Sequence, residues 1–498
     1  MNIKNKFLGC ILMKKNSVLI QINTRTWFNE IKNIFSDQSE PIQLDSLPDT
    51  VWNEFKEKGF NALYLLGVWK VDELTDEMID KKNLKQEFNE VLPNWKREDT
   101  CGSPFSIKEY KINPMLGDQN TLKNLKKQLN DLGMDLILDF VPNHFGLQNN
   151  YVDIPDLFIE EKNFSNSTRD YEVIETSNGK KAIYHGKDPY FPSWEDTFQL
   201  NYTSQNTRNF MLEQLKKIAE VCNGVRCDMA MLLVNRIIQQ TWGWKVSNDL
   251  ETEFWNEAIK EVKEMFPEFT FIAEVYWDME EELIHLGFDY CYDKKLYDTL
   301  RDQNIGTLEY ILHKEPSSQE HTVRFLENHD EARAINVFKS EMMFIDAVIT
   351  YTLPGIKFLH QKQIEGYHLK ESLFLLKRSQ EKENKELKKL FQTLFQILTM
   401  LSRETFNWTL GTNILKEDFD FGTNIYSWEW KNQKNNEKVV IIINFKNKGS
   451  LVKLNDKIKE LTVYNIYSSI FHRNITKKEE NDFVFELKPY GALFLKIV

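Results

Sequence analysis

The feature that most constrains the fold is an alternation of short apolar runs with longer amphipathic segments, from about residue 18 to residue 400. The runs are rich in β-branched and aromatic residues, which favour strands. They lie at residues 18–23, 62–67, 135–141, 224–229, 270–275, 288–293, 322–329 and 355–360. Continuous apolar strands that alternate with helices are typical of a parallel sheet covered on both faces, and eight repeats predict an α/β fold, a closed (β/α)₈ TIM barrel.

The segments between the runs have the periodicity of amphipathic helices. Residues 121–132 carry leucine at positions 122, 125, 129 and 132, which is the spacing of one helix face, and Gly133 follows as a C-cap.

Two regions interrupt the alternation. Residues 145–203, after the third strand, contain proline and Asn-Gly turn signals and little helical periodicity, which predicts an inserted irregular subdomain on the active-site face. Residues 405–498 show alternation and turns instead, which predicts a C-terminal antiparallel β-sandwich. The barrel then comprises residues 17–144 and 204–404.

Composition excludes several classes of function. The 498 residues include 63 Lys and Arg against 75 Asp and Glu, a net charge of −12, which argues against binding to nucleic acid or to an anionic membrane. The five cysteines are spread out without CxxC spacing, so we expect free thiols. The apolar run at residues 7–13 is too short for a signal peptide, and we therefore expect a cytoplasmic protein. The oligomeric state is left open.

Charged residues and histidines cluster where four predicted strands end. They are Asp139 and His144 on the third strand, Arg226 and Asp228 on the fourth, Glu274 on the fifth, and His329 and Asp330 on the seventh. Each alone has a structural explanation as a loop cap, a buried ion pair or a helix N-cap. The carboxyl ends of barrel strands meet at one rim, however, and convergence there favours catalysis.

This set meets the needs of glycoside chemistry, in which one carboxylate attacks and another carboxyl group donates a proton. Arg226 and Asp228 are two residues apart and therefore share a face of their strand, so that the cation keeps Asp228 charged. Glu274 follows an apolar strand, and we expect an apolar environment suited to the acid role. His144 and His329 can bind sugar hydroxyls as uncharged donors.

Four segments resemble the signature regions of the α-amylase superfamily, glycoside hydrolase family 13, and they occur in the right order. They are DFVPNH at 139–144, VRCDMA at 225–230, IAEV at 272–275 and LENHD at 326–330. The resemblance covers nearly the whole chain. It implies that Asp228 is the nucleophile, Glu274 the general acid/base and Asp330 the transition-state stabiliser. It also implies that Arg226, His144 and His329 line the −1 sugar site and that the α-configuration is retained.

The sequence departs from the family pattern at three places. Starch-degrading members usually carry Lys and His where this chain has Met231 and Leu232, which weakens the case for an ordinary endo-amylase. Phe105 stands in a segment where the family often stacks a tyrosine on the −1 sugar. Either Phe105 keeps the stacking without the hydroxyl or Tyr110 is merely structural, and we favour the former.

No cofactor motif is found and no metal ligand is assigned, although the resemblance leaves calcium open. Asn143 occupies a position that binds calcium in many members. The insert supplies further oxygen ligands from Asp153, Asp156, Asp188 and Asp196, although loop acids are more often solvated.

Three functions remain to be compared. The preferred one is an α-retaining hydrolase of α-linked oligosaccharides, and the second is a transglycosylase on the same scaffold, which the apolar residues 231–234 favour slightly. The third is a non-catalytic sugar-binding homologue, which the retained acids disfavour. The aromatic residues of segment 185–194 can be sugar platforms or a small core, and Trp242 and Trp244 stay unassigned.

Overall fold

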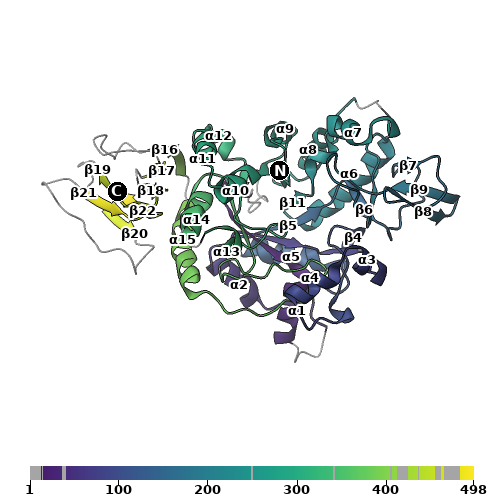
Figure 1. Ribbon diagram of the computed structural model, residues 1–498, viewed down its shortest axis with the longest axis horizontal. Coiled ribbons are helices and arrows are strands. Elements are labelled where there is room, and N and C mark those ends of the chain that lie inside the picture. The colour runs from purple at the N-terminus through teal and green to yellow at the C-terminus, as the bar shows by residue number, and fades with distance from the viewer. Residues whose placement is uncertain are drawn as a thin grey trace, which may run out of the picture. The chain divides into compact units, whose positions relative to one another are not determined.

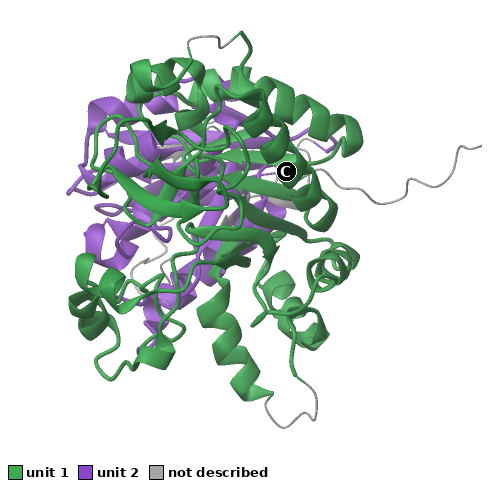
Figure 2. Ribbon diagram, turned by 90° about the vertical axis from the view of Figure 1, so that its right-hand side faces the viewer, with its two compact units in different colours: residues 1–13, 20–292, 369–380 green, residues 14–19, 293–368, 381–498 purple. Residues whose placement is uncertain are grey.

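The computed structural model describes residues 13, 15–35, 41–247, 251–339, 342–403, 406–411, 424–435, 437–454, 461–464 and 483–497. Apart from Met13, the apolar run at 7–13 lies outside the described residues, as do Cys10 and the boundary residue 405. The chain divides into two compact units, which Figure 2 colours separately. Unit 1 comprises residues 1–13, 20–292 and 369–380, and unit 2 comprises residues 14–19, 293–368 and 381–498.

Within the described residues, eight strands form a closed barrel in the hydrogen-bonded order β1-β15-β14-β13-β12-β11-β5-β2 (Figure 1). Their bounds are β1 Val18–Asn23, β2 Ala62–Leu66, β5 Asp135–Phe140, β11 Gly224–Cys227, β12 Thr270–Ala273, β13 Tyr290–Tyr292, β14 Thr322–Arg324 and β15 Ile356–His360. The ladders of β2 with β5, β5 with β11, β11 with β12, β12 with β13 and β14 with β15 are parallel. The predicted barrel is therefore confirmed.

Each predicted apolar run contains one of these strands, but several strands end before the run does. The run at 224–229 is a strand only to Cys227, and the run at 322–329 only to Arg324. The motif residues beyond these points lie outside the strands, where the Asn328 side chain accepts the Asp330 N–H and the Glu274 side chain accepts the Met229 N–H.

Helices connect the barrel strands and cover them. Helix α5 shows why they form: Leu122, Leu125 and Leu129 are buried on one face, and Gly133 ends the segment with a φ of +70° that glycine adopts without strain. None of the described helices is long and apolar enough to cross a membrane.

The α-helices are α1 Thr24–Ile34, α2 Asp49–Glu57, α3 Asp76–Lys81, α4 Leu84–Val91, α5 Thr121–Asp131, α6 Gln205–Val221, α7 Asn235–Trp242, α8 Phe254–Met265, α9 Glu280–His285, α10 Lys294–Arg301, α11 Ile305–Leu312, α12 Pro316–Gln319, α13 Ala334–Val337, α14 Met343–Thr352 and α15 Lys385–Arg403.

The region predicted as an insert contains short strands and turns and no helix between residues 145 and 203, all of which are described. Strands β7 Glu160–Glu161, β8 Tyr171–Thr176 and β9 Gly179–Tyr184 form a small antiparallel sheet, and β10 Thr197–Gln199 pairs with β6 His144–Gly146. The predicted Asn178-Gly179 turn joins β8 to β9. Another small sheet pairs β3 Trp69–Val71 with β4 Ile107–Ile112.

The C-terminal region is a β-sandwich in which one sheet has the order β16-β17-β18-β22-β20 and a second sheet pairs β19 with β21. Side chains of both sheets share one apolar core, in which Ile442 and Leu495 meet Val452 and Leu487. This arrangement confirms the predicted sandwich, drawn in yellow and green in Figure 1. The strands are β16 Phe406–Leu410, β17 Ile425–Asn432, β18 Lys438–Asn444, β19 Ser450–Leu454, β20 Leu461–Tyr464, β21 Phe483–Leu487 and β22 Ala492–Ile497.

Candidate active site

The backbone of three adjacent strands places the acidic residues of unit 1. Arg226 of β11 pairs in register with Asp139 of β5. The ladder continues one residue beyond the strands, because Asp228 N–H donates to the Phe140 carbonyl (2.9 Å) and Glu274 N–H donates to the Cys227 carbonyl (3.0 Å). Asp228 and Glu274 are therefore fixed at the carboxyl ends of β11 and β12, where barrels place their reactive groups.

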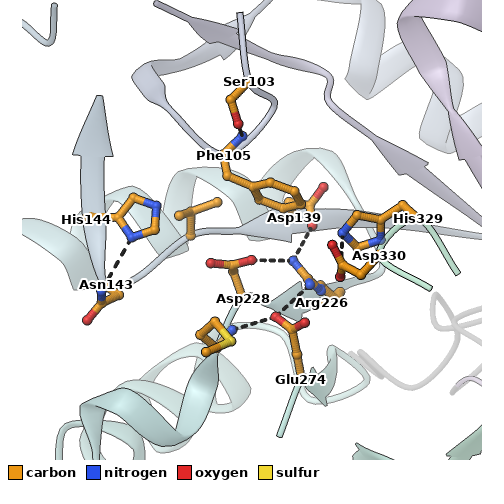
Figure 3. Close-up of polar contacts among 12 residues, drawn as sticks. Ser103, Phe105, Asp139, Asn143, His144, Arg226, Asp228, Glu274, His329 and Asp330 are labelled. Atoms are coloured by element: carbon orange, nitrogen blue, oxygen red, sulfur yellow. Dashed lines mark hydrogen bonds and ion pairs between the residues drawn. The ribbon is translucent and has the colours of Figure 1, made fainter. Parts of the chain in front are cut away.

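Arg226 connects three carboxyl groups of unit 1 (Figure 3). Its Nη1 lies 2.7 Å from Asp228 Oδ1 and 3.3 Å from Asp139 Oδ1, and its Nη2 lies 2.6 Å from Glu274 Oε2. The Arg226 side chain is only 1% exposed. Burial alone would lower the pKa of this guanidinium, but the charge of Glu274, followed by Tyr64 and Asp228, holds it well above its usual value. Arg226 is thus a permanent buried cation between two carboxylates.

The surroundings of Glu274 are polar, which differs from the apolar environment that we predicted. Besides Arg226, its Oε2 accepts the Met229 backbone N–H (2.8 Å), and its Oε1 accepts the Tyr276 hydroxyl (2.9 Å). Met229 reaches this position with a φ of +43°, a left-handed conformation that bulky residues rarely adopt. Tyr276 lies in the turn after β12, which ends at Ala273, so the alternation of the strand does not predict where the Tyr276 side chain points.

Asp139, one of the carboxyl groups beside Arg226, has a second buried partner in Tyr64. The Tyr64 hydroxyl of β2 donates to Asp139 Oδ1 over 2.5 Å, and both side chains are almost fully buried. Burial raises the pKa of Asp139 to about 6, although Arg226 and Tyr64 oppose that effect. The sequence analysis missed Tyr64, because an aromatic residue in an apolar strand resembles any core residue.

His144 and Phe105 border this cluster within unit 1. Burial lowers the pKa of His144 to about 4, with smaller opposing contributions from Asp196 and a hydrogen bond to the Phe105 backbone, which favours a neutral imidazole at pH 7. Its ring lies 5.3 Å from that of Trp194. The half-buried Phe105 ring lies 5.2 Å from Arg226 Cζ. Tyr110 instead bonds the Val141 backbone through its hydroxyl, a structural role.

The predicted residues of unit 2 form a compact loop after β14. Asn328 Oδ1 accepts the backbone N–H groups of Asp330 (2.8 Å) and Glu331 (2.9 Å), which fixes the turn. Within it His329 Nε2 lies 3.0 Å from Asp330 Oδ2 (Figure 3). The side chain of His329 is 1% exposed and that of Asp330 45%.

A buried ion pair that the sequence analysis missed supports this loop. Glu327 Oε1 accepts from Arg333 Nη1 (2.8 Å), and Glu327 Oε2 accepts the N–H of Ala334 at the start of α13 (2.6 Å). Arg333 also donates to the Gln361 carbonyl after β15. The acid of the LENHD motif that precedes Asn328 is therefore structural.

Three of the five residues that the resemblance left open for calcium, Asn143, Asp188 and Asp196, have other hydrogen-bond partners. Asn143 and Gln199 bond each other through their side chains, and Asp196 binds Lys82 Nζ (3.0 Å) and the Ser106 hydroxyl (3.0 Å). Asp188 Oδ1 accepts two backbone N–H groups of its own turn. Calcium requires six or more converging oxygens, and no metal-binding group of acids, histidines or cysteines occurs among the residues described.

The family model for the α-amylase catalytic domain matches residues 56–461. The chain therefore belongs to the α-amylase family, and the residues matched include the four motifs and every barrel strand except β1.

Curated relatives agree with this assignment. "Alpha-amylase 3" of Dictyoglomus thermophilum is 23% identical over 275 residues, which cover 50% of this chain and 51% of that protein. The cyclomaltodextrinase of Geobacillus thermopakistaniensis is 22% identical over 360 residues, 68% of this chain and 56% of that protein. The chain thus spans only about half to three fifths of the length of these relatives.

Solved structures share the fold across nearly the whole chain. The α-amylase of Lactobacillus plantarum has a TM-score of 0.64 at 19% identity, with 97% of this chain and 99% of that chain covered. The α-amylase of H. orenii has a TM-score of 0.64 at 15% identity, with 98% and 100% covered.

Proposed function

We propose that this chain is an α-retaining glycoside hydrolase that acts on α-glucosidic oligosaccharides by double displacement through a covalent glycosyl-enzyme. The observation that carries the proposal is that one buried guanidinium, Arg226, holds both Asp228 and Glu274. Retaining enzymes need their two carboxyl groups about 5 to 5.5 Å apart, closer than inverting enzymes do. Two carboxylates bound to the two terminal nitrogens of one guanidinium support the closer spacing.

In the first step Glu274 donates a proton to the glycosidic oxygen, and the bond from that oxygen to the anomeric carbon breaks. Asp228 attacks the same carbon from the opposite face and forms the covalent β-glycosyl-enzyme. Because Arg226 binds Asp228 Oδ1, we assign the attack to Oδ2. The Tyr276 hydroxyl donates to Glu274 Oε1 and therefore stabilises the carboxylate that remains after the proton has left.

In the second step the Glu274 carboxylate takes a proton from water, whose oxygen bonds to the anomeric carbon. The bond to Asp228 breaks, and two inversions leave the product with the α-configuration of the substrate. Arg226 stays charged throughout, so it stabilises Asp228 both before attack and on departure.

We assign the remaining residues from family membership and their local geometry. Asp330 is the transition-state stabiliser, His144 and His329 bind hydroxyls of the −1 sugar, and Phe105 stacks on it. The neutral state of His144 supports its role as a hydrogen-bond donor to a sugar. His329 Nε2 lies 3.0 Å from Asp330 Oδ2, and the Asn328 side chain fixes the backbone turn that carries Asp330.

Hydrolysis is preferred over transglycosylation because the apolar residues that favoured an acceptor site are not exposed. Residues 231–234 are at most 5% exposed and pack into the core, so they offer no shelf to an acceptor sugar.

We also propose a cytoplasmic location. The four described cysteines are free, and Cys222, Cys227 and Cys291 are buried thiols. One relative, 20% identical over 439 residues, is an intracellular maltogenic amylase of Bacillus subtilis.

The proposal is tested with a panel of α-linked di- and oligosaccharides, with the anomeric form of early products resolved by NMR. Asp228→Asn and Glu274→Gln should each lower turnover by at least about a thousand-fold. The exposed Asp131→Asn and Glu264→Gln are controls of the same chemistry and should keep wild-type turnover. Initial β-product, or near-normal turnover by either active-site variant, would refute the proposal, and products longer than the donor would identify a transglycosylase.

A further inference from the structure

Arg25 is a buried arginine outside the four sequence motifs. It lies in the first turn of α1, two residues after β1 ends, and is 1% exposed. Its Nη1 donates to the Gly102 carbonyl (2.7 Å), and its Nη2 donates to the Leu373 carbonyl (2.8 Å). No carboxylate among the described residues pairs with this guanidinium. A buried charge without an ion-pair partner is costly, so the two bonds to backbone carbonyls require an explanation.

The bond to Leu373 belongs to a segment, residues 373–376, that polar side chains of α1 hold within unit 1. Thr26 Oγ1 donates to the Leu375 carbonyl (2.9 Å), and Asn29 Nδ2 donates to the Leu376 carbonyl (3.0 Å). With Arg25, the first helix therefore binds three backbone carbonyls of this segment.

Residues 373–376 also pair with the chain that leads into Gly102. The Cys101 N–H donates to the Phe374 carbonyl (2.8 Å), and the Leu376 N–H donates to the Asp99 carbonyl (2.7 Å). Arg25 bonds both partners of this pairing with one side chain. We call its two bonds, to residues 102 and 373, the Arg25 clamp.

Gly102 begins the loop that carries Phe105. The Phe105 N–H donates to Ser103 Oγ (3.2 Å), and the Phe105 ring lies 5.2 Å from Arg226 Cζ (Figure 3). A Cβ at Gly102 would lie 1.9 Å from the Asp72 carbonyl oxygen. Close backbone packing and the Arg25 clamp therefore fix the start of the loop whose ring borders the buried cluster.

Arg25 also lies beside a backbone segment that supports Asp139. A Cβ at Gly67 would lie 3.3 Å from Arg25 Nε and 3.2 Å from Pro104 Cβ, so the three chain segments approach closely there. Burial raises the pKa of Asp139, and a hydrogen bond from the Gly67 backbone is among the contacts that oppose the rise. Arg25 thus contacts two segments that both reach the Arg226 cluster.

We propose that Arg25 is a positioning residue, which holds loop 102–105 against segment 373–376 and thereby fixes Phe105 for stacking on the sugar at the cleaved bond. The inference rests on the proposed function, in which Phe105 makes that contact. A planar guanidinium bonds two acceptors in a fixed geometry, which the ammonium of lysine on its flexible stem does not reproduce. Small displacements of groups that position a substrate cost large factors in rate, so loss of the clamp lowers turnover without removing any group that touches the substrate.

The first test is amide hydrogen exchange of the full chain without ligand, read by mass spectrometry. Arg25→Lys, and Arg25→Gln as a second variant that keeps one donor group, should raise exchange in peptides that cover residues 101–107 and 373–376. Exchange over α8, residues 254–265, reports the stability of unit 1 away from the clamp and should not change.

Arg208→Lys is the matched control for loss of a buried arginine. Arg208 is 6% exposed in unit 1 and donates to the carbonyls of Tyr202 (2.9 Å) and Thr252 (2.8 Å). It should leave both clamp peptides unchanged. Wild-type exchange in the Arg25 variants, or an increase that is uniform over the chain, would overturn the clamp whether or not the proposed function holds.

The second test is a double-mutant cycle with Phe105→Ala, using the α-linked oligosaccharide that the wild type hydrolyses fastest. Arg25→Lys should lower kcat/KM about ten-fold when Phe105 is present but less than about two-fold in Phe105→Ala. Any effect of Arg208→Lys should be the same in both backgrounds. Equal factors for Arg25→Lys in both backgrounds would refute action through Phe105. A wild type that turns over no α-glucoside would refute the proposed function instead, and the exchange experiment decides the clamp in that case.

Discussion

The contact between Tyr64 and Asp139 gives the sharpest test of how the buried cluster works. Tyr64→Phe removes only the hydroxyl that donates to Asp139 Oδ1 over 2.5 Å and leaves Arg226, at 3.3 Å, as the remaining side-chain donor shown for that oxygen. A buried hydrogen bond to a charged group contributes about 1.5 to 3 kcal/mol. We expect the free energy of unfolding at pH 8 to fall by that amount.

The same substitution predicts a change in pH dependence. Burial raises the pKa of Asp139 to about 6, and the Tyr64 hydrogen bond opposes the rise, so Tyr64→Phe should raise it further. A folded-state pKa above the unfolded value means that stability is fully present below about pH 4 and is lost as pH rises through the folded pKa. The variant should therefore lose less stability at pH 5 than at pH 8. The acid limb of its kcat/KM profile should move to higher pH, because a protonated Asp139 no longer balances Arg226.

Tyr110→Phe separates this electrostatic effect from the loss of any buried hydroxyl. Tyr110 is also buried, but its hydroxyl bonds the backbone of Val141. Urea unfolding at pH 5 and pH 8 and the pH profile of turnover are measured for both variants. Tyr110→Phe should lose about 1 to 3 kcal/mol without moving the acid limb. If both variants shift the profile equally, or Tyr64→Phe shifts neither profile nor stability, the reasoning about Asp139 is refuted.

Three further predictions concern other parts of the chain. EDTA should leave the Tm unchanged, since Lys82 occupies the Asp196 carboxylate, and a fall that calcium reverses would contradict this. Asp346 Oδ1 on α14 is buried without a hydrogen-bond partner, and burial raises the Asp346 pKa well above its usual value. Asp346→Asn should therefore gain at least about 1 kcal/mol in urea unfolding at pH 8 and much less at pH 4, and an equal gain at both would argue against an ionisation effect. Gly146→Ala should cost about 1 to 3 kcal/mol, because its Cβ would lie within 2.6 Å of the Asp72 carboxyl group, and a neutral result in the same assay would contradict that packing.

Local pattern was sufficient to predict the barrel, because each strand is a short apolar run whose length and composition are visible in the chain. The run at 18–23 coincides with β1, and β5 begins at the predicted residue. Strand ends were less accurate, since the predicted run at 322–329 continues beyond β14, which ends at Arg324. Strand β16 shows the alternation predicted for the C-terminal region, because buried and exposed residues follow each other along Phe406–Leu410.

The candidate site was predictable only where the chemistry is visible in residue type. Asp228 lies one residue beyond the strand that carries Arg226, and the ladder continues to it, so their contact followed from the period of two. The two donors to Glu274 could not be predicted from the sequence. The Met229 N–H points to Glu274 only because Met229 has a left-handed backbone conformation, and the Tyr276 hydroxyl comes from the turn after β12. Tyr64 and Arg333 were missed for a related reason: their partners are distant in sequence or lie across a turn, and nothing in the local pattern indicates them.

The most direct measurement is to trap the covalent intermediate on Asp228. The wild-type chain is incubated with 5-fluoro-α-glucosyl fluoride, whose ring fluorine slows both steps and whose fluoride leaves readily, and the protein is then analysed by intact mass and peptide mapping. We predict a stoichiometric glycosyl adduct on the peptide that contains Asp228, and its absence in Asp228→Asn. An adduct on another residue, or fluoride release with initial β-product and no adduct, would contradict the double displacement.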